Sequence, residues 1–136
     1  MKIEAKWQNG MHFTSSAPTG HTISIDSGPA GAVTAGPSPM EITLQAAAAC
    51  SGMDVVAILE KKRKTPELFE IEVEGSRTEN HPKVFKSVNL LYKFKGDNLK
   101  EKDVEQAVRL SVEKYCSVLI MISKTAEITW NYELLN

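Results

Sequence analysis

Residues 38–63 of this 136-residue chain read SPMEITLQAAAACSGMDVVAILEKKR, and this segment predicts one long helix. Ser38 can cap the helix, Pro39 suits the first helical position, and Glu41 completes a capping box. The positively charged run before the next proline indicates that the helix ends near Lys62. The middle of the segment is apolar on nearly all sides, which predicts a central, buried helix rather than an amphipathic surface helix.

The residues before the long helix predict three short strands. Apolar residues alternate with polar ones over residues 3–7, 11–13 and 23–25, as in half-buried strands. Asn9-Gly10 is a hairpin signal between the first two strands. The glycine- and proline-rich residues 26–37 then predict a loop that leads into the helix.

The residues after the long helix predict two long strands, a second helix and a last strand. Alternation over residues 70–74, 88–94 and 126–134 indicates the strands. Asn98 and Glu101 form a second capping signal. An apolar stripe at helical spacing follows this signal, made of Val104, Ala107, Val108, Ser111, Val112 and Tyr115.

The predicted order β-β-β-α-β-β-α-β is typical of an α+β domain with a mainly antiparallel sheet. A chain of this length fits a single domain over residues 1–136. So small a monomer has little surface with which to hide the long apolar helix, so we expect an intertwined homodimer.

The charge balance limits the classes of partner. The chain has 16 basic and 17 acidic residues and a net charge of −1, which disfavours nucleic acid. Its most apolar stretch, residues 46–59, is short of the roughly 20 residues of a membrane span, so we expect no membrane contact. Residues 1–6 are charged and unlike a signal peptide, and we therefore expect a reducing, cytoplasmic location.

Two cysteines, Cys50 and Cys116, are the candidate catalytic residues. Either could be a small core residue, since cysteine is most often buried. Cys116 closes the second helical segment and can open a further short helix, whose N-terminal N–H groups would favour the thiolate. A thiol peroxidase needs one thiolate to attack the peroxide and a second thiol to form the disulfide. Three histidines and two cysteines show no metal-ligand spacing, so we expect no metal and no cofactor.

Residues 36–56, GPSPMEITLQAAAACSGMDVV, resemble the central helix of the OsmC-like family. That family includes osmotically inducible protein C and the organic hydroperoxide resistance proteins. Residues 112–118, VEKYCSV, resemble the helix that carries the family's second cysteine. The order of strands and helices also matches, so the resemblance covers essentially the whole chain.

The resemblance implies an intertwined homodimer with two sites at the subunit interface. It also implies a thiol-dependent peroxidase that reduces organic hydroperoxides and is recycled by a dithiol reductant. Cys50 would be the peroxidatic cysteine and Cys116 the resolving one.

The chain departs from the family at the residues that orient the reactive thiolate. The peroxidases have an arginine on the N-terminal strands, and here no arginine precedes Arg63. The glutamate on their central helix lies ten positions before the first cysteine, where this chain has Met40. The peroxidases also commonly have a proline directly after the second cysteine, where this chain has Ser117.

Other charged residues lie near the cysteines in the sequence. His12 or His21 could supply the cation that the arginine supplies elsewhere, although each could equally be a surface residue. Asp54, one turn beyond Cys50 on the same helix face, would raise the pKa of the thiol. The alternative function is therefore an OsmC-like protein that binds a small apolar ligand, or uses its thiols otherwise, without efficient peroxide reduction.

Overall fold

A computed structural model describes residues 1–135 of the chain. Its elements follow the predicted order, with a π-helical turn (η1) and a short helix added before the last strand: β1 (Glu4–Asn9), β2 (His12–Ser16), β3 (Thr22–Ile25), α1 (Pro39–Lys61), β4 (Leu68–Arg77), β5 (Phe85–Lys95), α2 (Glu101–Leu110), η1 (Ser111–Tyr115), α3 (Ser117–Ile122) and β6 (Glu127–Leu135). The chain divides into two compact units, Met1–Thr43 and the residues from Leu44 onward.

The N-terminal unit is a three-stranded antiparallel sheet in the order β1-β2-β3. The expected hairpin at Asn9-Gly10 is present, and Gly10 adopts a φ of +51°, where glycine is favoured. In the loop after β3, the Asp26 carboxylate accepts N–H bonds from Ser27 (2.8 Å) and Ala35 (2.9 Å). Those two backbone bonds lower the pKa of Asp26. This unit leaves several large apolar side chains exposed: Ile3, Trp7, Met11, Phe13 and Ile23.

The helix α1 begins at the predicted capping box. The backbone N–H of Ser38 donates to Glu41 Oε1 (3.0 Å), and the N–H of Glu41 donates to Ser38 Oγ (3.2 Å). Hydrogen bonding of the Glu41 carboxylate to the backbone N–H of Ser38, and to the Ser38 side chain, lowers the pKa of Glu41. In a single chain only one face of this helix is covered, so its predicted burial depends on the expected second copy. The buried residues recur at helical spacing: Ala47, Ser51, Gly52, Val55 and Leu59.

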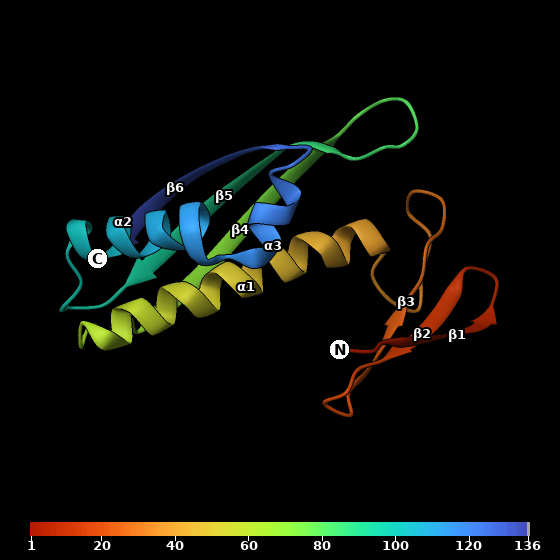
Figure 1. Ribbon diagram of the computed structural model, residues 1–136, viewed down its shortest axis with the longest axis horizontal. Helices are drawn as coiled ribbons and strands as arrows, with labels where there is room; N and C mark the ends of the chain where they lie inside the picture. Colours follow the sequence, from red (N-terminus) through yellow and green to blue (C-terminus); the bar gives the residue numbers. More distant parts are fainter. Residues whose placement is uncertain (136) are drawn as a thin grey trace. The chain divides into compact units, whose positions relative to one another are not determined.

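The unit from Leu44 onward is built on the sheet β4-β5-β6. The pair β4–β5 is antiparallel, with Ile71 opposite Tyr92, and β5–β6 is parallel, with Leu90 opposite Trp130. Parallel neighbours need a crossover, which α2, η1 and α3 supply. The helices lie on one side of this sheet (Figure 1). The core on that face is formed by alternate residues of β5, namely Val88, Leu90, Tyr92 and Phe94.

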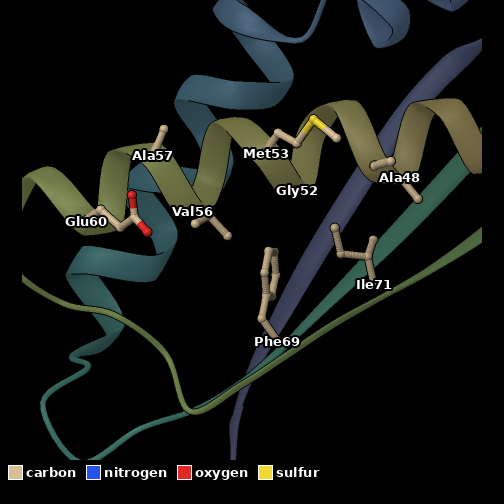
Figure 2. A pocket seen from close by; sticks show the side chains of 9 residues that line it. Ala48, Gly52, Met53, Val56, Ala57, Glu60, Phe69 and Ile71 are labelled. Atoms are coloured by element: carbon tan, nitrogen blue, oxygen red, sulfur yellow. The ribbon is translucent and has the colours of Figure 1, made fainter. Parts of the chain in front are cut away.

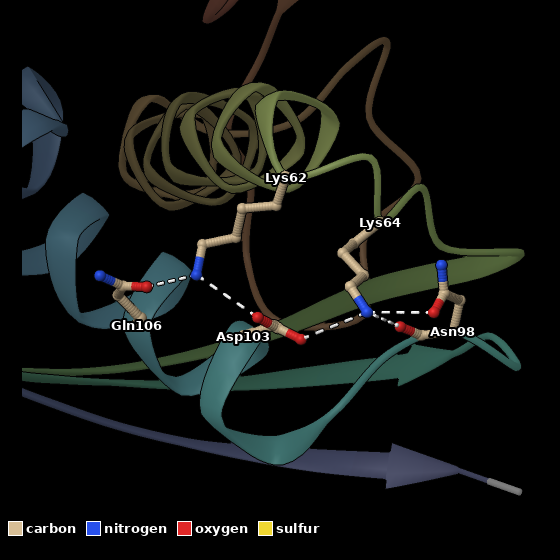
Figure 3. Close-up of polar contacts among 5 residues, drawn as sticks. All are labelled: Lys62, Lys64, Asn98, Asp103 and Gln106. Carbon is tan, nitrogen blue, oxygen red and sulfur yellow. Dashed lines mark hydrogen bonds and ion pairs between the residues drawn. The ribbon is translucent and has the colours of Figure 1, made fainter.

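The start of α2 differs from the sequence prediction, because Asn98 does not cap the helix. Lys100 occupies the N-cap position and makes no side-chain cap bond. Asn98 instead accepts two bonds from Lys64 Nζ, one at its carbonyl oxygen (2.8 Å) and one at Oδ1 (3.0 Å). Asp103, in the first turn of α2, pairs with Lys62 (3.4 Å) and Lys64 (3.9 Å), which follow α1 (Figure 3). These contacts hold the end of α1 against the start of α2.

We expect Asp103→Ala to lower the free energy of unfolding by about 2 kcal/mol, because it leaves two partly buried lysines without their carboxylate. Asp103 is only 6% exposed, and it also sits at the positive end of α2. Urea unfolding of the two proteins measures the change. Glu105→Ala, which removes the more exposed pair with Arg109, is the matched control and should change stability by less than about 0.5 kcal/mol. Equal losses in both variants would contradict this role for Asp103.

The apolar stripe predicted on the second helix ends earlier than its spacing implies. Val104, Ala107, Val108 and Ser111 are buried, but Tyr115 is 50% exposed. The reason is η1, since a π turn contains more residues than an α-helical turn and rotates the following side chains away from the stripe.

The length argument against a membrane span was also wrong, because α1 has 23 residues and is apolar enough to cross a membrane. A core helix of a soluble protein meets the same criteria. One face of α1 packs on the sheet and buries a serine hydroxyl there, and the helix carries Glu41, Asp54 and Glu60. These features fit a core helix.

Candidate functional site

The structure brings Cys50 and Cys116 together, although 66 residues separate them. Cys50 lies in the middle of α1, as predicted, and Cys116 directly follows η1. The two Sγ atoms and a carboxylate oxygen of Asp54 all lie within 4.8 Å of one another. Both cysteines are free thiols; Cys50 is half-buried and Cys116 is fully buried. The expectation that both cysteines occupy one site is therefore confirmed in its geometry.

The π turn η1 places Cys116 in this site. The N–H of Cys116 donates to the carbonyl oxygen of Ser111 (2.8 Å), which closes the wide turn. Cys116 then leaves helical geometry (φ −73°, ψ 100°) and becomes the N-cap residue of α3. Its sulfur accepts the N–H of Leu119 at 3.4 Å. The thiol is thus held at the junction between two helical segments.

A chain of buried hydroxyl groups leads to Asp54. Tyr92 OH lies 2.6 Å from Ser51 Oγ, which lies 2.8 Å from Ser111 Oγ. Ser111 Oγ donates to Asp54 Oδ2 at 3.1 Å. The Ser111 hydroxyl has a second acceptor in reach, the carbonyl oxygen of Ser51 at 3.3 Å. A carboxylate only accepts hydrogen bonds, so when Ser111 donates to Asp54 the chain runs from Tyr92 through both serines to Asp54. Sequence reasoning missed this chain; its signal is two serines on otherwise apolar helix faces.

Burial controls the acidity of the Cys116 thiol. Desolvation, helped by the nearby Cys50 sulfur and Asp54 carboxylate, raises the pKa of Cys116 to about 11. The Leu119 N–H acts in the opposite direction but is the smaller effect. The predicted effect of the helix N-terminus is therefore present, but burial outweighs it, and the alternative of a buried core cysteine describes this thiol. Burial likewise raises the pKa of Tyr92 to about 12.

No cation compensates the acidic groups of the site. Among residues 1–135, no lysine, arginine or histidine side chain pairs or hydrogen-bonds with Cys50, Asp54 or Cys116. Asp54 and Lys61 both line a small hollow of about 150 Å³ beside Tyr115, without forming an ion pair there. The two candidate histidines belong to the N-terminal unit. His12 has a buried Nε2 without a hydrogen-bond partner among the described residues, and the Nδ1 atom of His21 lies 3.0 Å from Thr19 Oγ1.

Comparison with known proteins identifies the family of this chain. A family model described as OsmC-like protein matches residues 29–131. Protein YhfA of Escherichia coli K12 is 41% identical over 134 residues, which is 98% of each chain. The chain belongs to the OsmC-like protein family.

Solved structures of other OsmC-like proteins share the fold. A hypothetical protein from Aquifex aeolicus is 34% identical and superposes with a TM-score of 0.83, covering 99% of this chain and 97% of that one. The organic hydroperoxide resistance protein OhrB of Bacillus subtilis is 18% identical, with a TM-score of 0.69 over 97% and 96% of the two chains. The α+β fold and the OsmC-like resemblance are thus both confirmed.

This OsmC-like chain also has an open apolar groove along α1, which neither thiol lines. The groove has a volume of about 560 Å³ and lies between α1 and β4 (Figure 2). Gly52 lets the helix approach the strand closely, since a Cβ there would lie 3.1 Å from Ile71 Cδ1. Met53, on the rim, is 71% exposed. The groove is lined by Ala48, Ala49, Gly52, Met53, Val56, Ala57, Glu60, Phe69 and Ile71.

The raised pKa of Cys116 predicts a pH dependence of stability in the reduced OsmC-like chain. Between pH 9 and 11 the unfolded chain loses the thiol proton, since the ordinary pKa is 9.0, whereas the native chain keeps it. The contribution of the buried neutral thiol to the free energy of unfolding is thus full below pH 9 and is lost as pH rises towards 11. We expect the free energy of unfolding of the wild-type chain to fall about 2 kcal/mol more than that of Cys116→Ala over this interval. Parallel pH profiles in urea unfolding would contradict the burial of a neutral thiol.

Proposed function

We propose that this OsmC-like protein is a thiol-dependent peroxidase that reduces organic hydroperoxides, with Cys50 as the peroxidatic and Cys116 as the resolving residue. The proposal rests on the approach of the two sulfur atoms and Asp54 to within 4.8 Å of one another. Cys50 is the more accessible of the two thiols, so it is the one that a substrate can reach. Family membership supports a role related to peroxide stress.

The chemistry needs two steps and an external dithiol. In the first step, the Cys50 sulfur attacks the O–O bond of ROOH, giving a sulfenic acid and the alcohol ROH. In the second step, Cys116 attacks the sulfenic sulfur, which forms the disulfide and releases water. A dithiol then reduces the disulfide and is itself oxidised. Disulfide formation needs the α-carbons to come within about 7 Å, and the present separation of the sulfur atoms requires at most a small movement.

Asp54 has a defined part in the second step. Cys116 is a neutral thiol at physiological pH, because burial raises its pKa to about 11. It must lose its proton to attack, and the Asp54 carboxylate is the acceptor within 4.8 Å. The hydroxyl chain from Tyr92 fixes the carboxylate through Ser111. The proton then leaves with the hydroxide that the sulfenic acid releases as water.

A second function is favoured by the lack of a cation at the site. A peroxidatic thiolate normally requires positive potential, and the described residues supply no ion pair or hydrogen bond from a cationic side chain. The open apolar groove beside α1 would hold a small apolar ligand instead. In that case, the chain keeps the OsmC-like fold but uses its thiols for other chemistry.

We also propose an intertwined homodimer that functions in the cytoplasm. Two apolar surfaces support the dimer: the groove along α1 and the exposed side chains of the N-terminal sheet, including Trp7 (65% exposed). The family match at residues 29–131 crosses the boundary between the two units, which supports one OsmC-like domain over residues 1–136. Free thiols at the site fit a reducing compartment.

Steady-state turnover tests the peroxidase proposal directly. The reduced protein is mixed with cumene hydroperoxide and dihydrolipoamide, and consumption of the hydroperoxide is followed under conditions where the uncatalysed reaction is subtracted. We expect multiple turnovers with cumene hydroperoxide. A control titration shows that both thiols are free. If such protein turns over neither cumene hydroperoxide nor a fatty-acid hydroperoxide, the peroxidase function is contradicted and the binding of a small apolar ligand is favoured.

A further inference from the structure

We propose that the reduced site binds one zinc ion through the sulfur atoms of Cys50 and Cys116 and a carboxylate oxygen of Asp54. The proposal goes beyond peroxide reduction, because it requires only that both cysteines are reduced. It concerns a site that the spacing of residues in the sequence does not reveal, since Cys116 lies 66 positions from Cys50 and reaches it only through the π turn.

The geometry of the three groups is close to that of a metal site. Tetrahedral zinc, with bonds of about 2.3 Å to sulfur and about 2.1 Å to oxygen, separates its ligand atoms by about 3.6–3.8 Å. Here the three candidate atoms lie within 4.8 Å of one another. A shift of about 1 Å in the side chains closes this difference. Cys50 and Asp54 lie one turn apart on α1, so their spacing is fixed by the helix.

The electrostatics of the site favour a cation. Two ionisable thiols and a carboxylate converge, and no described cationic side chain pairs with any of them. Buried acidic groups in proteins are normally paired or coordinate a metal. The Ser111 hydroxyl donates to Asp54 Oδ2 at 3.1 Å and so orients the carboxylate. Carboxylates that bind metals are usually held by such a hydrogen bond.

The ligand set selects zinc among common divalent ions. Two thiolates exclude magnesium and calcium, which take oxygen ligands, and one carboxylate with two thiolates suits the borderline-soft Zn²⁺. Three protein ligands leave the fourth tetrahedral position for water. The hollow beside Asp54 and Tyr115 gives access to the site from solvent.

Proton and charge balance describe how zinc and peroxide compete. When both thiols start protonated, the binding of one Zn²⁺ ion to the two sulfur atoms and the carboxylate releases two protons. The bound thiolates are then no longer free for other chemistry. Oxidation by ROOH, with uptake of two protons, gives the disulfide, ROH, water and free Zn²⁺. The site would therefore hold zinc only in its reduced state and release it on oxidation.

Cobalt and zinc titrations of the reduced, full-length protein test the proposal under anaerobic conditions. We expect one Co²⁺ per chain, with a thiolate-to-cobalt charge-transfer band in the near ultraviolet and visible bands of tetrahedral intensity. Zinc should displace cobalt stoichiometrically and bleach these bands. Protein oxidised to the disulfide should show no such spectrum, and this serves as the internal control.

Variants separate the three ligands from nonspecific binding. Cys50→Ser and Cys116→Ser should each weaken zinc binding at least about 100-fold, and Asp54→Asn about 10- to 100-fold. Glu105→Gln, a carboxylate change on α2 outside the site and outside the α1 groove, should leave the affinity unchanged. Circular dichroism confirms that each variant is folded before it is titrated.

Two outcomes overturn the zinc site. One is the absence of a thiolate charge-transfer band in reduced wild-type protein, and the other is equal zinc affinity in wild-type, Cys116→Ser and Asp54→Asn proteins. Neither depends on turnover, so a failed zinc titration leaves the peroxidase proposal standing. An inactive protein that binds zinc would support the zinc site alone.

Discussion

We expect the replacement of Cys50 with serine to lower the rate of the proposed organic hydroperoxide reduction at least about 1,000-fold, because serine lacks the nucleophilic sulfur that takes up the peroxide oxygen. The change replaces one sulfur atom with oxygen in the middle of α1 and leaves the helix and its buried face intact. Steady-state consumption of cumene hydroperoxide with dihydrolipoamide, in metal-free buffer, measures the loss. Retention of more than a tenth of the wild-type rate would show that Cys50 is not the peroxidatic residue.

Two further serine variants separate the roles of the thiols. Cys116→Ser should still consume one equivalent of hydroperoxide per chain and accumulate a sulfenic acid on Cys50, which dimedone traps and mass spectrometry detects. It should not form the internal disulfide. Ser117→Ala, next to Cys116 but with an exposed side chain, is the matched control and should retain wild-type turnover. A Cys116→Ser variant that recycles at the wild-type rate would contradict the resolving role.

Introducing a charge into the α1 groove should dissociate the proposed homodimer. In Met53→Glu, a carboxylate replaces a methionine that is 71% exposed in the single chain and lies on the rim of the groove. Burying this charge against a second copy without a partner costs several kcal/mol, so we expect the dissociation constant to rise at least about 1,000-fold. Sedimentation equilibrium at micromolar concentration should then give the mass of the 15.0 kDa chain, whereas the wild-type protein gives twice that mass.

Two matched substitutions control for side effects of the charge. Met53→Leu keeps an apolar side chain of similar volume and should remain dimeric. Met121→Glu places the same charge on α3 at a methionine that is 66% exposed and outside the groove, and it should also remain dimeric. Dissociation by Met121→Glu but not by Met53→Glu would place the interface elsewhere, and a monomeric wild-type protein would contradict the dimer itself.

Local signals in the sequence predicted the backbone elements well. Ser38 and Glu41 form the capping box that starts α1, and alternation of apolar residues located β4, β5 and β6. These signals act over a few residues, so they depend little on the tertiary fold. The capping signal at Asn98 failed because a distant lysine, Lys64, takes both acceptors of that residue.

The candidate site was predictable only in part. The sequence singled out Cys50 and Cys116, and the resemblance to the OsmC-like family implied that they share one site. Their surroundings were not predictable, because the acidity of Cys116 depends on burial by the tertiary fold and on charges brought from α1. The hydroxyl chain through Ser51 and Ser111 joins residues 60 positions apart and has no local pattern. A π turn likewise leaves no clear periodic signal, so the break in the stripe before Tyr115 was missed.

The position of the thiol depends on how residues 111–115 wind as well as on their identity. Residues of η1 between Ser111 and Cys116 are mostly exposed, so they contribute little to the core. If the same number of residues wound as an ordinary α-helix, Cys116 would be rotated by about 100° around the axis, since each residue of such a helix advances by that angle. Its thiol would then point away from Cys50 while both cysteines remained in the sequence. Among related chains, one that keeps the length of this segment but winds it as an α-helix would therefore separate a cysteine pair that an alignment still counts as present.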